Sequence, residues 1–177
     1  MTDHIGLVHS YYGDGKGKTT AAFGLALRCL GYGQTVVIAQ FFKSRSSGEV
    51  SFIETMSNAV LLRGYPFKKF TFQMNDEERA LLKTDCIQLF TKAVSEAETL
   101  NARLLVLDEC LDACGNGYLP VSLVNDFLDS RPKDLEVVFT GHCMPPEIEK
   151  RSDYISKIVN EKHPFNQGIA ARKTIEF

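Results

Sequence analysis

The sequence of 177 residues lacks several features, and each absence narrows the class of protein. No apolar run approaches the roughly 20 residues that a membrane-spanning helix needs, and no charged segment followed by an apolar one stands at the N-terminus. The formal net charge is only -2, so the chain as a whole does not attract nucleic acid. We therefore expect a protein that binds neither membranes nor nucleic acid.

The cysteines do not form a disulfide framework either. There are five of them, an odd number without close and regular spacing, which suits a reducing compartment and predicts a cytoplasmic protein. Internal repeats and low-complexity tracts are also missing. The hydrophobic content of 44% is sufficient for a substantial core, so we predict one domain over residues 1–177.

Apolar, β-branched runs alternate with segments of helical periodicity along the chain. We expect strands at 5–11, 35–41, 59–63, 103–108, 135–140 and 154–159. We expect helices at 18–30, 49–56, 120–130 and 146–151, and a long helix from a cap at Asn75 to about Leu100. This alternation predicts an α/β fold, with a mostly parallel sheet flanked by helices on both faces.

The segment YGDGKGKTT, residues 12–20, lies between the first expected strand and the first expected helix. Glycines in such a loop let consecutive backbone N–H groups converge on one anion, and the helix N-terminus adds a favourable dipole. Lys18 would reach the terminal phosphates, and the hydroxyl of Thr19 would bind Mg²⁺. The strict P-loop pattern has a glycine where this chain has Tyr12, and Gly13 comes one place late. We predict a triphosphate-binding loop with a displaced first glycine.

Two acids, Asp108 and Glu109, follow an apolar strand. Carboxylates at this position can hold Mg²⁺ directly or through water, opposite Thr19. Acids at strand ends also serve simply as solubilising residues. Because Glu109 could instead activate water in an ATPase, the acidic pair by itself does not select one reaction.

Five blocks in order span nearly the whole chain. They are GDGKGKTTAAFGLALRCLGYG at 13–33, QFFKSRSSGE at 40–49, LLVLDE at 104–109, RPKDLEVVFTG at 131–141 and KHPFNQGIAARKTIEF at 162–177. Together they resemble the ATP:corrinoid adenosyltransferases of the cobalamin-biosynthesis type. The resemblance implies a P-loop RecA-like fold, a homodimer and MgATP as substrate. It also implies transfer of the 5′-deoxyadenosyl group of ATP to Co(I) of a reduced corrinoid, with release of tripolyphosphate, in adenosylcobalamin biosynthesis or salvage.

The same resemblance implies roles for single residues. Lys18 and Glu109 are the expected catalytic residues, and the expected Mg²⁺ ligands are Thr19, Asp108 and Glu109. The corrinoid would face the aromatic pair Phe70 and Phe72, and an electron-donating flavoprotein is the implied partner. ATP would be held by Gly13, Asp14, Gly15, Lys16, Gly17, Lys18, Thr19, Thr20 and Arg28.

Two other functions remain compatible with these residues: a RecA-like ATPase or nucleotide kinase, and a non-catalytic protein that binds a nucleotide or a corrinoid. Some residues also differ from the family pattern. Asp14 replaces an asparagine, His142 an arginine and Phe72 a tryptophan. An acid in the loop should weaken the binding of a polyanion unless its side chain faces Mg²⁺, a lysine or solvent.

Overall fold

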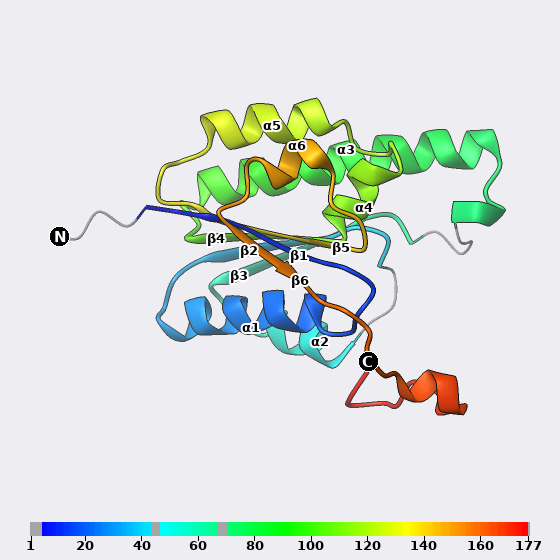
Figure 1. Cartoon of the computed structure of the whole chain (residues 1–177). Coiled ribbons are helices and arrows are strands. Elements are labelled where there is room, and N and C mark those ends of the chain that lie inside the picture. Colours follow the sequence, from blue (N-terminus) through cyan, green and yellow to red (C-terminus); the bar gives the residue numbers. More distant parts are fainter. Residues whose placement is uncertain (1–4, 44–46, 67–70, 177) are drawn as a thin grey trace.

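The computed structural model describes residues 5–43, 47–66 and 71–176, apart from the side chain of Phe72 (Figure 1). The strands form one six-stranded sheet in the order β3-β2-β4-β5-β1-β6, and every pairing in it is parallel. The strands are β1 (Val8–Tyr12), β2 (Val36–Gln40), β3 (Ala59–Arg63), β4 (Leu104–Asp108), β5 (Glu136–Gly141) and β6 (Tyr154–Lys157). The α/β fold predicted from the sequence is confirmed.

Helices cover both faces of this sheet (Figure 1). The α-helices are α1 (Lys18–Gly31), α2 (Gly48–Ile53), α3 (Asp76–Thr99), α4 (Cys110–Gly115), α5 (Val121–Ser130) and α6 (Pro146–Glu149), and the 3₁₀ helices are η1 (Thr71–Gln73) and η2 (Pro164–Gln167). Helices α1 and α2 lie on one face, and α3, α5 and α6 lie on the other. Every residue of β2 and β4 is buried, which explains why both strands are almost continuously apolar. No helix in the described part of the chain is long and apolar enough to cross a membrane.

Local signals predicted most element boundaries. The side chain of Asn75 accepts the Glu78 N–H at 2.8 Å, and the Glu78 carboxylate accepts the Asn75 N–H at 3.0 Å. This capping box begins α3, as predicted. Strand β1 begins at Val8 rather than at Ile5, and α4 was not predicted. Since α4 has only 6 residues, it is too short to show helical periodicity.

The parallel arrangement brings the carboxyl ends of the strands to one edge of the sheet. Gln40 at the end of β2 pairs in register with Asp108 at the end of β4. Tyr12 at the end of β1 pairs with Gly141 at the end of β5. Ligands of open α/β sheets bind at this edge, and the glycine-rich loop and the acidic pair both follow strands that end there.

Candidate active site

The loop between β1 and α1 is fixed by backbone hydrogen bonds to β5 and to the segment after β6. The Gly13 N–H donates to the Gly141 carbonyl at 3.1 Å, and the Gly15 N–H donates to the Ile158 carbonyl at 2.9 Å. Gly13 has a φ of +116°, and a Cβ there would lie 2.3 Å from the Ile158 oxygen. Only glycine fits this position, because both the conformation and the space exclude a side chain. The Lys18 ammonium donates to the Gly15 carbonyl at 2.8 Å.

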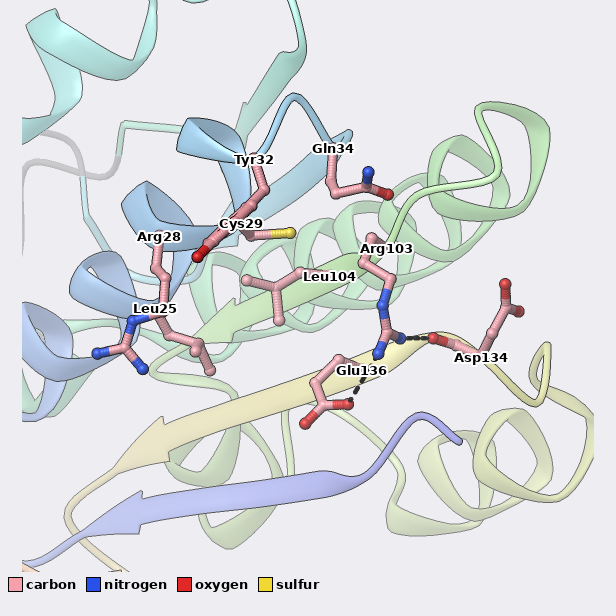
Figure 2. Close-up of a pocket in the computed structure, with 9 residues that line it drawn as sticks. All are labelled: Leu25, Arg28, Cys29, Tyr32, Gln34, Arg103, Leu104, Asp134 and Glu136. Carbon is pink, nitrogen blue, oxygen red and sulfur yellow. Dashed lines mark hydrogen bonds and ion pairs between the residues drawn. The ribbon is translucent and has the colours of Figure 1, made fainter. Parts of the chain in front are cut away.

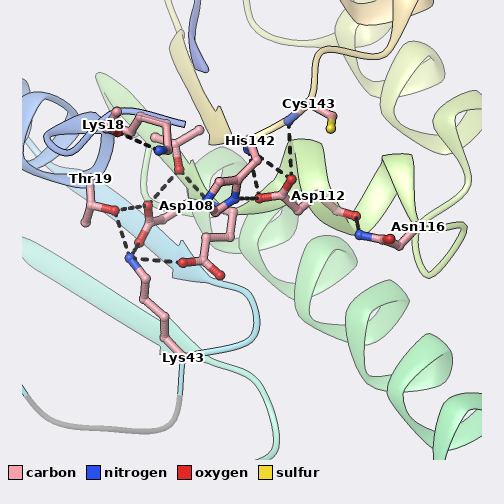
Figure 3. A network of polar contacts seen from close by, with 11 residues as sticks. Lys18, Thr19, Lys43, Asp108, Asp112, Asn116, His142 and Cys143 are labelled. Atoms are coloured by element: carbon pink, nitrogen blue, oxygen red, sulfur yellow. Dashed lines mark hydrogen bonds and ion pairs between the residues drawn. The ribbon is translucent and has the colours of Figure 1, made fainter. Parts of the chain in front are cut away.

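Asp108 is the centre of a polar network beside this loop (Figure 3). Its side chain is completely buried, with 0% exposure. The carboxylate accepts hydrogen bonds from Thr19 Oγ1 at 2.9 Å, Thr140 Oγ1 at 2.7 Å, Gln40 Nε2 at 3.0 Å and Lys43 Nζ at 2.6 Å. The buried charge is therefore compensated by one cation and three neutral donors, as buried ions require.

Lys43 was not predicted as a site residue. Its ammonium lies 2.8 Å from Thr19 Oγ1, 2.6 Å from Asp108 Oδ2 and 3.5 Å from Glu109 Oε1. Figure 3 shows the side chain reaching toward Thr19 and Asp108 from the segment after β2. The available sequence signal was weak: a lysine shortly after a buried strand, in a segment that composition assigns to a loop.

Glu109 follows Asp108 and begins α4 in a left-handed conformation, with a φ of 64°. Its N–H donates to Thr140 Oγ1 at 2.8 Å, so the hydroxyl of Thr140 links the backbone of Glu109 to the carboxylate of Asp108. Burial raises the pKa of the Glu109 carboxyl above its usual value; Lys43 acts in the opposite direction, and Asp108 and Asp112 add to the rise. A bound cation would favour the ionised form of this carboxyl.

The residues of this network fit a magnesium ion. Mg²⁺ prefers oxygen ligands and is usually held by one or two carboxylates together with substrate phosphates. Thr19, Asp108 and Glu109 supply one hydroxyl and two carboxylates around a point where a cation already lies. The buried Oε1 of Gln40 has no hydrogen-bond partner among the described residues.

A cavity of about 490 Å³ adjoins the network on the side of Glu109. Its lining mixes apolar and polar side chains and consists of Phe42, Tyr65, Thr71, Met74, Leu82, Asp85, Glu109, Asp112, Asn116 and His142. Among them, the Asp112 carboxylate accepts the His142 N–H at 2.9 Å and lies 2.9 Å from the ring Nδ1 of His142 (Figure 3). Glu109 thus belongs to both the polar network around Asp108 and the cavity.

Comparisons with known proteins match this sequence to a family. Residues 4–177 match the model of the family described as "ATP:corrinoid adenosyltransferase BtuR/CobO/CobP". The chain belongs to this family. It is 35% identical over 176 residues to a corrinoid adenosyltransferase of Pseudomonas aeruginosa, and this match covers 97% of this chain and 82% of the relative. It is 30% identical over 175 residues to the corrinoid adenosyltransferase CobA of Salmonella typhimurium, covering 97% of this chain and 86% of the relative. It is 29% identical over 178 residues to a corrinoid adenosyltransferase of Escherichia coli, and this match covers 99% of this chain and 87% of the relative.

Family membership confirms the resemblance, and the structure places most of the predicted site residues together. Lys18, Thr19, Asp108 and Glu109 lie in one region, next to the glycines of the loop. Asp14 is exposed, which meets the condition that its carboxylate faces solvent. Lys16 and Thr20 are also exposed at the loop and the start of α1.

Most of the aromatic pair that we predicted to face the corrinoid lies outside the residues that the structure describes. Phe70 lies outside the described residues, and so does the side chain of Phe72. Their neighbour Thr71 lines the 490 Å³ cavity. The assignment of both aromatic residues to the corrinoid stays a prediction.

Arg28 is the one predicted nucleotide ligand that the structure does not bring to the loop. It lies near the C-terminal end of α1, roughly 15 Å along the helix axis from Lys18 at 1.5 Å per residue. There it lines a second cavity, of about 610 Å³, at the start of β4 and β5 (Figure 2). The other lining residues are Leu25, Cys29, Tyr32, Gln34, Arg103, Leu104, Asp134 and Glu136. A direct role of Arg28 in binding ATP stays a prediction.

Proposed function

We propose that this protein transfers the 5′-deoxyadenosyl group of MgATP to Co(I) of a reduced corrinoid and releases tripolyphosphate, in adenosylcobalamin biosynthesis or salvage. Family membership supports an enzyme that acts on ATP and a corrinoid. The observation that carries the finer proposal is the position of Glu109, which joins the cation-binding network of the phosphate loop to an adjoining, partly apolar cavity. Triphosphate and corrinoid would therefore meet at Glu109.

The proposed reaction makes few demands on acid–base groups of the protein. Co(I) supplies both electrons of the new Co–C5′ bond, and the C5′–O bond breaks with its electron pair on tripolyphosphate. Negative charge thus develops on the triphosphate oxygens, so donors placed around them lower the barrier. The loop N–H groups and the Lys18 ammonium would supply such donors once Lys18 releases the Gly15 carbonyl.

Thr19, Asp108 and Glu109 would hold Mg²⁺. The ion would supply further charge stabilisation to the leaving tripolyphosphate. Asp108 is fixed by Thr140 and Gln40, so its carboxylate needs no rearrangement before binding the ion. Such preorganisation is how a protein places charge at low energetic cost during the reaction.

The 490 Å³ cavity is the proposed place of the reacting face of the corrinoid. Its volume falls in the usual range of ligand pockets, roughly 300–1,000 Å³, and Phe42, Met74 and Leu82 give it an apolar wall. Apolar side chains exclude water and would favour cobalt without a lower ligand, which is more easily reduced. Phe70 and Phe72, on either side of Thr71 in the sequence, remain the residues proposed to face the corrinoid.

One anaerobic assay tests the function. The protein is mixed with ATP, Mg²⁺ and a chemically reduced corrinoid, and the products are separated. We expect tripolyphosphate and a light-sensitive alkylcorrinoid in equal amounts. Release of ADP and phosphate without change of the corrinoid would instead indicate an ATPase or kinase, and binding of both ligands without product would indicate a non-catalytic binding protein.

Three further parts of the proposal rest on the resemblance alone: the protein is a homodimer, it is located in the cytoplasm, and it receives electrons from a flavoprotein. Sedimentation velocity measures the oligomeric state, and a reaction that starts from Co(II) with a reduced flavoprotein measures the electron transfer. Phe70→Ala should impair this Co(II)-dependent reaction while sparing the reaction with prereduced Co(I). Equal rates for the variant and wild type in both reactions would contradict the assignment of Phe70.

A further inference from the structure

The Lys43 ammonium lies among the same three side chains that would hold Mg²⁺. It is within 2.8 Å of Thr19 Oγ1, 2.6 Å of Asp108 Oδ2 and 3.5 Å of Glu109 Oε1. Figure 3 shows its side chain extending from the segment after β2 to Thr19 and Asp108. The structure thus holds a cation of the protein's own at the position of the metal.

A buried carboxylate needs such a cation. The side chain of Asp108 has 0% exposure, and removal of the only charge beside a buried ion is strongly destabilising. Among the described residues, Lys43 is the one cation that forms an ion pair with Asp108. In the nucleotide-free protein, Lys43 therefore neutralises Asp108 and reduces the repulsion between Asp108 and Glu109.

The ammonium and Mg²⁺ cannot occupy the site together. Mg²⁺ binds oxygen at about 2.0–2.1 Å, so an ion on Thr19 Oγ1 and Asp108 Oδ2 would take the space that Nζ now fills, 2.8 and 2.6 Å from the same atoms. Two cations at this separation also repel each other strongly. Entry of the metal must therefore displace Lys43.

The surroundings indicate where the displaced ammonium goes. The Lys43 side chain is 28% exposed and already reaches Thr19, the residue directly after the phosphate-binding Lys18. Once Asp108 and Glu109 are occupied by Mg²⁺, the nearest negative charges are the phosphate oxygens bound by the loop and the ion. A flexible lysine side chain can move to them without a change in strand β2, which precedes it.

We propose that Lys43 is an internal counter-ion: it occupies the metal site of the nucleotide-free protein, gives way to the Mg²⁺ that arrives with ATP, and then binds the triphosphate. This inference rests on the proposed Mg²⁺ and ATP sites. Before ATP binds, Lys43 compensates the charge of Asp108 and holds the site in place; afterwards, it contacts the triphosphate.

The first test measures Mg²⁺ alone, without nucleotide, by calorimetry and by the rise of the melting temperature with Mg²⁺ concentration. Lys43→Met removes the competing cation, so we expect this variant to melt at a lower temperature than wild type in the absence of metal. We also expect it to bind Mg²⁺ about tenfold more tightly, because no ammonium has to be displaced from the site before the ion binds. Lys43→Gln keeps a hydrogen-bond donor toward Asp108 and should show the same tightening if Lys43→Met does not fold. Lys150→Met removes an exposed lysine on another part of the chain and should match wild type.

The second test measures tripolyphosphate in the presence of saturating Mg²⁺. We expect Lys43→Met and Lys43→Gln to bind it about tenfold more weakly than wild type, the loss of one charge-assisted contact. The same variants thus gain metal affinity and lose tripolyphosphate affinity, a combination that a general loss of folding would not produce.

Each alternative result has a definite meaning. Unchanged or weaker Mg²⁺ binding in both Lys43 variants would show that Lys43 does not compete with the metal. Unchanged tripolyphosphate binding would overturn its transfer to the phosphates. A wild-type protein whose binding of ATP and tripolyphosphate does not depend on Mg²⁺ would overturn the metal site itself, and would leave the adenosyltransferase reaction to be judged by the product assay.

Discussion

The carboxylate of Asp112 and the imidazole of His142 are paired in the lining of the 490 Å³ cavity. The carboxylate accepts the His142 backbone N–H at 2.9 Å and lies 2.9 Å from Nδ1 of the ring. A carboxylate at this nitrogen favours the tautomer with its proton on Nδ1, so that Nε2 is the free nitrogen. His142 lines the cavity together with Glu109, and its orientation thus depends on Asp112.

We expect Asp112→Asn to raise the KM for the corrinoid by about tenfold while the KM for ATP changes little, because the variant loses a charge-assisted hydrogen bond to the ring. Steady-state kinetics with each substrate varied in turn measure this difference. His142→Ala should give a similar effect, and the double variant should be no worse than either single one, because the residues act as a unit. Additive losses would contradict a role of Asp112 through His142.

Lys18→Ala should abolish measurable turnover, a loss of at least about 10²–10³ in kcat, because the ammonium would stabilise charge that develops on the leaving tripolyphosphate. Production of tripolyphosphate measures this loss. The melting temperature should stay near that of wild type, since the described Lys18 side chain contributes one hydrogen bond, to the Gly15 carbonyl. Lys150→Ala is the charge-matched control and should keep full activity. A Lys18 variant with more than a tenth of wild-type kcat would exclude this role.

Gly13→Ala should destabilise the protein and weaken ATP binding. The new Cβ would lie 2.3 Å from the Ile158 oxygen, at a residue with a φ of +116°, so the loop would have to move away from the segment after β6. Urea unfolding and ATP titration measure the two effects. Gly24→Ala in α1 is the matched control, because a Cβ there meets no atom within 4 Å. That control should stabilise the protein by about 0.5–1 kcal/mol.

Thr140→Val should lower the free energy of unfolding by about 1–3 kcal/mol, because the Glu109 N–H and one oxygen of buried Asp108 would lose their shared partner. The hydroxyl lies 2.8 Å from the Glu109 nitrogen and 2.7 Å from Asp108 Oδ1. Denaturant unfolding without metal measures the loss. Thr140→Ser keeps the hydroxyl and should retain most of the stability; a Thr140→Val variant as stable as wild type would contradict this role of the hydroxyl.

The cysteines should differ in reactivity under native conditions. Cys143 is exposed, whereas burial raises the pKa of Cys86 to about 12 and also raises that of Cys110. Thiolates are the reactive species, so an alkylating reagent at mild pH should modify Cys143 first and Cys86 only after unfolding. Mass spectrometry of the alkylated peptides measures this order.

The same pKa has a consequence for stability. Cys86 is protonated in the folded chain between its ordinary pKa of 9.0 and about 12, while the unfolded chain is ionised there. Stability should therefore fall as the pH rises through this interval. Replacement by alanine, Cys86→Ala, should reduce this dependence, although it also lowers stability at every pH by leaving a small cavity. An unchanged slope of stability against pH in the variant would contradict the assignment to Cys86.

Local patterns in the sequence were sufficient for the order of the strands and of the α-helices other than α4, for the glycine-rich loop and for the acidic pair at the end of β4. Each of these features depends on residues close together in the chain: the periodicity of apolar side chains, the glycines of residues 13–17, and the capping pair Asn75 and Glu78. The family was also recognisable, because its motifs are contiguous blocks.

The tertiary structure alone decided which distant side chains meet. The parallel register of β2 and β4 sets Gln40 opposite Asp108, and the chain that continues from β2 brings Lys43 onto Thr19 and Asp108. The Asp112–His142 pair likewise depends on how α4 packs beside β5. The sequence carries no local signal for such contacts, because they arise from strand register and helix packing between segments far apart in the chain. For the same reason the sequence determined the glycine-rich loop, while the contact of the Lys43 ammonium with Thr19 and Asp108 became apparent only in the folded protein.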